Sequence, residues 1–141
     1  MLNLRFLLAA VLSCLSAQAG AAGVLDRLGG TWDTVPIYRG GCESDTYFHT
    51  IEVSPDKGHV TFKHLKPIPG PNGPIQQYSY KVLYEEDDRV TLYLEGETRR
   101  QANGDRPIWV LILERPDYYR WRIYGTAADA RNTVTGMRCK E

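Results

Sequence analysis

Histidines carry the most versatile chemistry in this chain, and two of the three, His49 and His64, fall in segments of alternating polar and apolar residues. Alternation with period two over Asp45–Val53 and again over His59–Leu65 predicts two β-strands. The segment between them, Ser54–Gly58, is a strong turn signal, so the strands are expected to form a hairpin. Pairing through this turn places His49 opposite His64 or the residue before it, and the two imidazoles become neighbours.

Two interpretations of this histidine pair remain open at the level of sequence. The imidazoles could orient a ligand, or bind haem or a metal, inside a cup. Alternatively, both could be hydrogen-bonded to tyrosines in a polar barrel interior. We favour the second interpretation, because a metal normally needs a third ligand, and we assign neither a metal site nor a cofactor.

Aromatic residues supply the second candidate chemistry. Alternation over Gln76–Glu85 places Tyr78, Tyr80 and Tyr84 on one face of a strand. Such a row either lines a pocket for an apolar or aromatic molecule or fills a narrow barrel. The residues that we expect to contact a ligand combine inward-facing aromatic and histidine positions: Tyr47, His49, Phe62, His64, Tyr78, Tyr80 and Trp121.

The remaining polar groups do not point to catalysis or to a charged partner. The chain contains no HExxH, no GxSxG elbow and no glycine-rich phosphate loop after a strand, so we do not expect an enzyme. Seventeen Lys and Arg balance seventeen Asp and Glu, which leaves no basic excess for nucleic acid or an anionic membrane. We interpret the acidic cluster Glu85–Asp88 and the pair Arg99-Arg100 as solvated turns.

The first residues have the pattern of an export signal. Arg5 precedes a short apolar run, and Ala17-Gln18-Ala19 is a small-x-small cleavage site. Residues 1–19 are therefore predicted to be a cleaved signal peptide, 20–141 a single domain, and the protein periplasmic or secreted, with no transmembrane segment. Lipidation at Cys14 is the alternative, although the apolar run before it is very short for a lipobox.

Two cysteines remain after such a cleavage, Cys42 and Cys139. In an oxidising compartment, two well-separated cysteines are expected to form one disulfide, here between the start of the fold and its last strand. Neither cysteine has CxxC spacing or a nearby histidine, which argues against a metal pair.

The strands that position these residues follow one another without a long helix. Sequential hairpins of this kind predict an all-β fold, an eight-stranded antiparallel up-and-down barrel with one disulfide. The longest connection expected is Lys66–Pro74, which contains four prolines and two glycines. It could be a lid, a rigid segment presented to a protein partner or an ordinary connection. The expected strands are Thr31–Tyr38, Asp45–Val53, His59–Leu65, Gln76–Glu85, Arg89–Arg99, Pro107–Glu114, Tyr118–Tyr124 and Thr133–Lys140.

Gly30-Thr31-Trp32 at the first strand and Arg138 near the end of the last strand complete a family pattern. With eight strands in meander order, the chain resembles the lipocalins and the wider calycin-type barrels, here as a bacterial, exported member. The resemblance implies that Trp32 plugs one end of the barrel and that Arg138 packs over it, with Arg122 as a competitor for that role. A ligand is then expected at the opposite, open end.

These patterns lead to two functional hypotheses. The first is an exported lipocalin-like protein that binds a small apolar or aromatic molecule in its barrel. The second is a periplasmic protein-binding module, such as an inhibitor of a hydrolase, that uses the Lys66–Pro74 segment.

Overall fold

The computed structural model describes residues 22–34, 42, 47–70, 72–126 and 134–140. The predicted signal peptide, residues 1–19, and Cys14 lie outside the described residues. A short helix, α1 (Val24–Leu28), precedes eight strands: β1 (Gly30–Thr34), β2 (Phe48–Val53), β3 (His59–Ile68), β4 (Ile75–Glu85), β5 (Arg89–Leu94), β6 (Trp109–Arg115), β7 (Tyr118–Ile123) and β8 (Thr135–Arg138).

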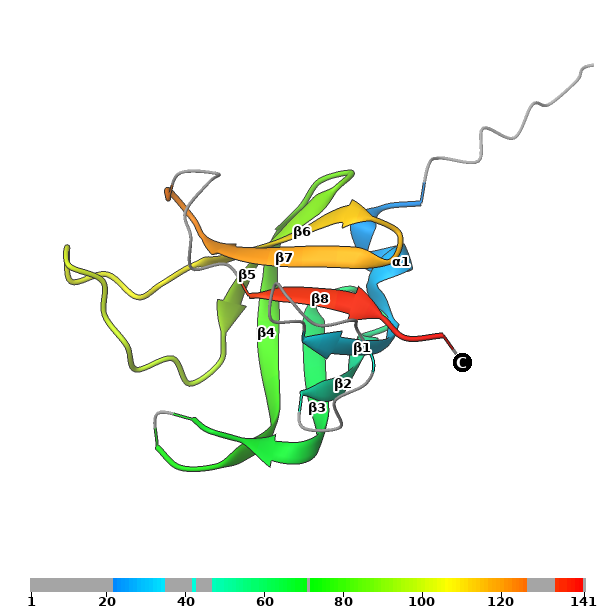
Figure 1. The fold of residues 1–141 in the computed structure, drawn as a ribbon. Coiled ribbons are helices and arrows are strands. Elements are labelled where there is room, and N and C mark those ends of the chain that lie inside the picture. The colour runs from blue at the N-terminus through cyan, green and yellow to red at the C-terminus, as the bar shows by residue number, and fades with distance from the viewer. Residues whose placement is uncertain (1–21, 35–41, 43–46, 71, 127–133, 141) are drawn as a thin grey trace, which may run out of the picture.

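Each strand pairs antiparallel with the next one along the chain, and β1 pairs with β8 to close the barrel (Figure 1). The predicted fold class is therefore confirmed. Strand ends differ from the prediction at two places that matter for the site. β3 runs on to Ile68, beyond the expected end at Leu65, and β5 stops at Leu94, before the expected end at Arg99.

Because successive strands run in opposite directions, their connections lie alternately at the two ends of the barrel. α1 lies at the end that carries the β2–β3 and β4–β5 turns, because Asp26 forms an ion pair of 2.6 Å with Lys57 and Arg27 donates to the carbonyl of Asp87. Strands of an up-and-down barrel alternate in direction, so the β3–β4 and β5–β6 connections lie at the opposite end. Figure 1 shows these two connections, in green and yellow, projecting away from α1. We call the barrel end that carries α1 the closed end and the opposite end the open end.

Trp32 fills the closed end, as the sequence predicts. Its side chain is fully buried, and its indole Nε1 donates to the carbonyl of Leu28 at 3.0 Å. The apolar residues of α1, which include Leu25 and Leu28, belong to the same buried cluster. The ring of Tyr119 packs against Trp32 with centroids 5.0 Å apart, so the plug is continuous with the barrel core.

Arg138, rather than Arg122, packs over the plug. Its guanidinium lies 4.2 Å from the centroid of the Trp32 ring and donates to the carbonyl of Gly29 at 2.7 Å and to that of Pro116 at 3.1 Å. It thereby joins the end of α1 to the β6–β7 turn. Gly30 makes this approach possible, because its φ is +129° and a Cβ there would lie 2.5 Å from Arg138 Nη1.

The predicted disulfide is present between Cys42 and Cys139, which are 97 residues apart in the chain. The predicted inward position of Tyr84 is wrong. A bulge in β4 between Val82 and Tyr84 shifts the register against β5, and the side chain of Tyr84 is 63% exposed. The same bulge turns Glu85 toward α1, where it accepts a hydrogen bond of 3.0 Å from the backbone N–H of Leu25.

Candidate ligand-binding site

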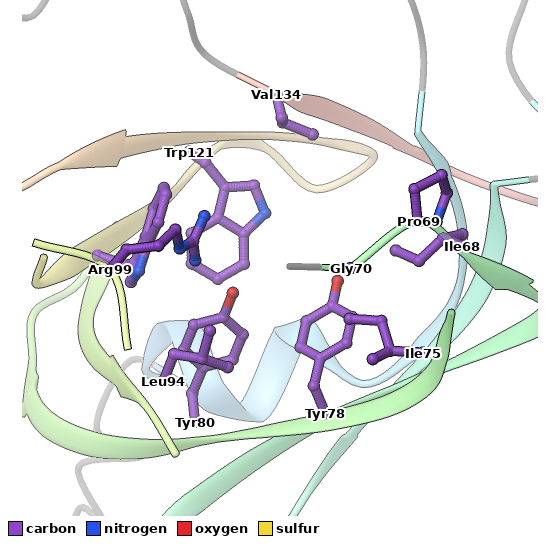
Figure 2. Close-up of a pocket in the computed structure, with 11 residues that line it drawn as sticks. Ile68, Pro69, Gly70, Ile75, Tyr78, Tyr80, Leu94, Arg99, Trp121 and Val134 are labelled. Atoms are coloured by element: carbon purple, nitrogen blue, oxygen red, sulfur yellow. The ribbon is translucent and has the colours of Figure 1, made fainter. Parts of the chain in front are cut away.

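A cavity of about 220 Å³ lies at the open end of the barrel and is open on one side (Figure 2). The β3–β4 hairpin forms one rim of this open-end cavity through Ile68, Pro69, Gly70 and Ile75. Part of the predicted Lys66–Pro74 loop is therefore a wall of the cavity, because β3 extends into it. Val134, just before β8, is part of the lining as well.

Aromatic side chains from three strands form most of the remaining wall. Tyr78 and Tyr80 come from β4, Trp109 from β6 and Trp121 from β7. The rings of Tyr80 and Trp121 pack with centroids 5.1 Å apart, and Trp109 meets Trp121 edge-on at 6.3 Å. Because these rings hold one another by direct contact, the wall is formed without a ligand.

The two tyrosines place hydroxyl groups on an otherwise apolar wall. Figure 2 shows the hydroxyl oxygens of Tyr78 and Tyr80 directed into the space facing Trp121. Burial raises the pKa of both phenols above the usual value, so each hydroxyl keeps its proton at neutral pH. The Tyr80 hydroxyl can therefore donate a hydrogen bond to a guest molecule as well as accept one, whereas the Tyr78 hydroxyl also lies 3.2 Å from His64 Nε2.

Arg99 contributes the only charged side chain among the described residues that line the cavity. Its guanidinium lies 5.2 Å from the centroid of the Trp109 ring and donates to the Glu97 carboxylate from Nε at 2.8 Å and from Nη2 at 2.6 Å. The backbone N–H of Arg99 also donates to this carboxylate, at 2.9 Å. Burial opposes ionisation of Glu97, but these hydrogen bonds and the charge of Arg99 outweigh it and lower the pKa of the carboxyl. The Arg99 side chain is consequently held in one orientation at the cavity mouth.

His49 and His64 are cross-strand partners, as the hairpin pairing predicts, with ring centroids 5.1 Å apart. His49 Nδ1 lies 2.8 Å from the carbonyl oxygen of Tyr47, which can only accept, so Nδ1 carries the proton. His49 Nε2 then accepts from the hydroxyl of Tyr119 at 2.9 Å. Both nitrogens of this buried ring are satisfied, and burial lowers the pKa of His49.

His64 joins the histidine pair to the cavity wall. Its Nε2 lies 3.2 Å from the hydroxyl of Tyr78, whereas its Nδ1 is buried and has no hydrogen-bond partner within the described part of the chain. Burial, with the neighbouring His49 as a smaller cause, lowers the pKa of His64 to about 4. In the described ranges, no group of three or more His, Cys, Asp or Glu side chains is placed to hold a metal ion.

Three of the seven residues predicted to contact a ligand line the open-end cavity: Tyr78, Tyr80 and Trp121. His49, Phe62 and His64 are buried outside its lining, and Phe62 stacks on Tyr78 with the ring planes 4° apart. Tyr47 does not line the cavity and is 40% exposed. The reason is that β2 begins at Phe48, so the inward alternation does not extend to Tyr47.

Sequence reasoning missed Arg99, Leu94, Trp109 and the hairpin rim. Arg99 was expected in a solvated turn at the end of a strand, but β5 ends before it, and its partner Glu97 is only 2% exposed. One signal was available. The long connections follow the odd-numbered strands, and in a meander all of these connections lie at one end.

Comparison with protein-family models, with curated proteins and with solved structures found no match to this chain. None of the helices in the described residues is long and apolar enough to span a membrane. The topology and the cavity are therefore the observations from which function has to be argued.

Proposed function

We propose that this chain is an exported, lipocalin-like protein of bacterial origin that binds a small aromatic molecule at the open end of its barrel. The observation that carries the proposal is the open-end cavity itself, with Tyr80, Trp109 and Trp121 around it. Concave, mostly apolar sites with a few polar groups are typical of small-molecule binding.

The volume of the cavity favours a molecule with one aromatic ring. An apolar protein cavity of about 150 Å³ accommodates benzene, and the open-end cavity measures about 220 Å³. A substituted benzene therefore fits, whereas a long lipid chain would extend beyond the cavity.

Export is supported by the cysteines and by the start of the sequence. A disulfide such as Cys42–Cys139 forms and persists in oxidising compartments, which include the periplasm and the extracellular space. A cleaved signal peptide at 1–19 would deliver the chain there.

The alternative hypothesis, a protein-binding module acting through Lys66–Pro74, is less well supported. Ile68, Pro69 and Gly70 of this segment line the open-end cavity. Their position supports a role as a rim around a small guest, and a protein partner would need contacts beyond the cavity.

The proposal is tested by titrating ¹⁵N-labelled protein with toluene and following the three tryptophan indole signals by NMR. Trp109 and Trp121 line the cavity, whereas Trp32 lies at the closed end and is an internal control. We expect saturable shifts of the first two signals and none of the third. Shifts of all three to the same extent, or of none, would contradict the proposal.

A matched pair of variants locates the site. Leu94→Trp fills the open-end cavity and should abolish the shifts. Leu65→Trp introduces the same bulk at a position that is 59% exposed and does not line the cavity, and it should leave the shifts intact.

A further inference from the structure

Arg99 and Glu97 form a charge-compensated pair at the cavity mouth. The carboxylate of Glu97 is almost entirely buried and receives two side-chain donors and one backbone donor from Arg99. The fixed positive charge of Arg99 is therefore already matched by a fixed negative charge a hydrogen bond away. A buried carboxylate with this many partners is not released without a large cost.

The guanidinium retains donors that Glu97 does not use. An arginine has five N–H groups, and Glu97 accepts from one on Nε and from one on Nη2. The side chain is half exposed and lines the open-end cavity beside Trp121 and Tyr80 (Figure 2). Arg99 can thus donate to a guest molecule without giving up its partner.

The charge of the bound molecule determines how favourable a hydrogen bond from Arg99 is. A carboxylate placed against Arg99 would lie close to the buried carboxylate of Glu97, and like charges repel one another more strongly beside a buried group than in bulk water. A neutral acceptor, such as an amide or ketone oxygen, accepts the same hydrogen bond without that repulsion and is cheaper to remove from water.

We infer that the open-end cavity selects neutral aromatic molecules that carry a hydrogen-bond acceptor over aromatic carboxylates, and that Glu97 sets this preference by compensating Arg99. This inference rests on the proposed function and names its ligand class. Glu97 acts as a positioning residue, because it works through Arg99.

Benzamide and benzoate provide a test, since they have nearly the same shape and differ in charge at neutral pH. Titrations of the wild-type protein, followed by the indole signals of Trp109 and Trp121, should give a dissociation constant at least about tenfold lower for benzamide, which corresponds to about 1.4 kcal/mol. Benzoate binding as tightly as benzamide would overturn the inference.

Glu97→Gln separates the compensating charge from the shape of the site. The amide keeps an acceptor for Arg99 but leaves its charge unmatched, so the preference for benzamide should disappear or reverse. Glu95→Gln is the matched control, because Glu95 lies on the same connection with its side chain 51% exposed and should leave the ratio unchanged. An unaltered ratio in Glu97→Gln would contradict the role of Glu97.

The two proposals fail in different ways in this experiment. If toluene binds and benzoate binds as tightly as benzamide, the charge preference is wrong and the binding function stands. If toluene, benzamide and benzoate all leave the Trp109 and Trp121 signals unmoved, both proposals are wrong.

Discussion

The two buried histidines of this barrel differ in how many of their ring nitrogens are hydrogen-bonded. His49 is buried with both ring nitrogens hydrogen-bonded, whereas His64 is buried with one nitrogen bonded to Tyr78 and the other without a partner in the described residues. Neither ring has a nearby carboxylate that would favour protonation among its described contacts. Burial thus favours the neutral form of both rings, and each is hydrogen-bonded to a tyrosine hydroxyl, Tyr119 for His49 and Tyr78 for His64.

This neutrality predicts that stability falls on acidification. Histidine in an unfolded chain has a pKa of about 6.5, and His64 in the folded protein has a pKa of about 4. Between these values the unfolded state binds more protons, so the free energy of unfolding should decrease as the pH falls from about 6.5 to about 4, and His64 should have no effect above that range. Urea denaturation at a series of pH values measures this slope.

Carboxylates titrate in the same pH range, so variants of the buried His64 and of the surface His59 are needed to isolate the contribution of His64 to the pH dependence of stability. His64→Phe should flatten the dependence between pH 6.5 and 4. His59→Gln removes a histidine from the outer face, where it faces Glu95, and is the matched surface control. A slope unchanged by His64→Phe would contradict the assignment.

The burial of Trp32 leads to a second prediction, which concerns the free energy of unfolding. Its side chain is fully buried, donates to Leu28 and packs against Arg138 and Tyr119. Trp32→Ala should lower the free energy of unfolding by about 3 to 5 kcal/mol, the cost of removing a buried aromatic. Trp109→Ala, at the partly exposed open end, should cost less, and denaturant titrations that rank the two variants in the opposite order would refute the plug.

Individual elements show which parts of the structure the sequence could predict. The Ser54–Gly58 turn and the alternation on both sides of it fix the β2–β3 register, and the predicted neighbours His49 and His64 are indeed paired. The closed end was predicted from the family resemblance carried by Gly30-Thr31-Trp32 and Arg138, and Trp32 and Arg138 are indeed direct partners across β1 and β8. Local periodicity is sufficient wherever a strand is regular.

Irregular elements mark the limit of such predictions. The bulge in β4 inserts one residue into the ladder, after which Tyr84 points outward and Glu85 points toward α1. Alternation alone cannot show this shift, because it accompanies a tertiary contact between Glu85 and the N–H of Leu25, which is 60 residues away in the chain. In the same way, β5 ends at Leu94, and the pair formed by the buried Glu97 and the half-exposed Arg99 belongs to an irregular connection that has no period to detect.

The two ends of the barrel are built differently, and we expect the closed end to determine stability and the open end to determine binding. The closed end combines α1, Trp32, Arg138 and short turns, and its polar groups are satisfied internally. The open end has the long connections and a wall of aromatic rings with a cavity between them. Substitutions at the closed end should therefore change stability and spare binding, whereas those at the open end should change binding and cost less stability.

The Cys42–Cys139 disulfide links the connection between β1 and β2 to the residue just after β8, and the two cysteines are 97 residues apart in the chain. Cross-linking a loop of this length restricts the unfolded chain and typically stabilises a fold by about 2 to 4 kcal/mol. Cys42→Ser combined with Cys139→Ser should lower the free energy of unfolding by that amount, measured by urea denaturation. The residual barrel should still bind toluene at the open end, since neither cysteine lines that cavity. A double variant as stable as the wild type would show that strand pairing between β1 and β8 closes the barrel without help from the cross-link.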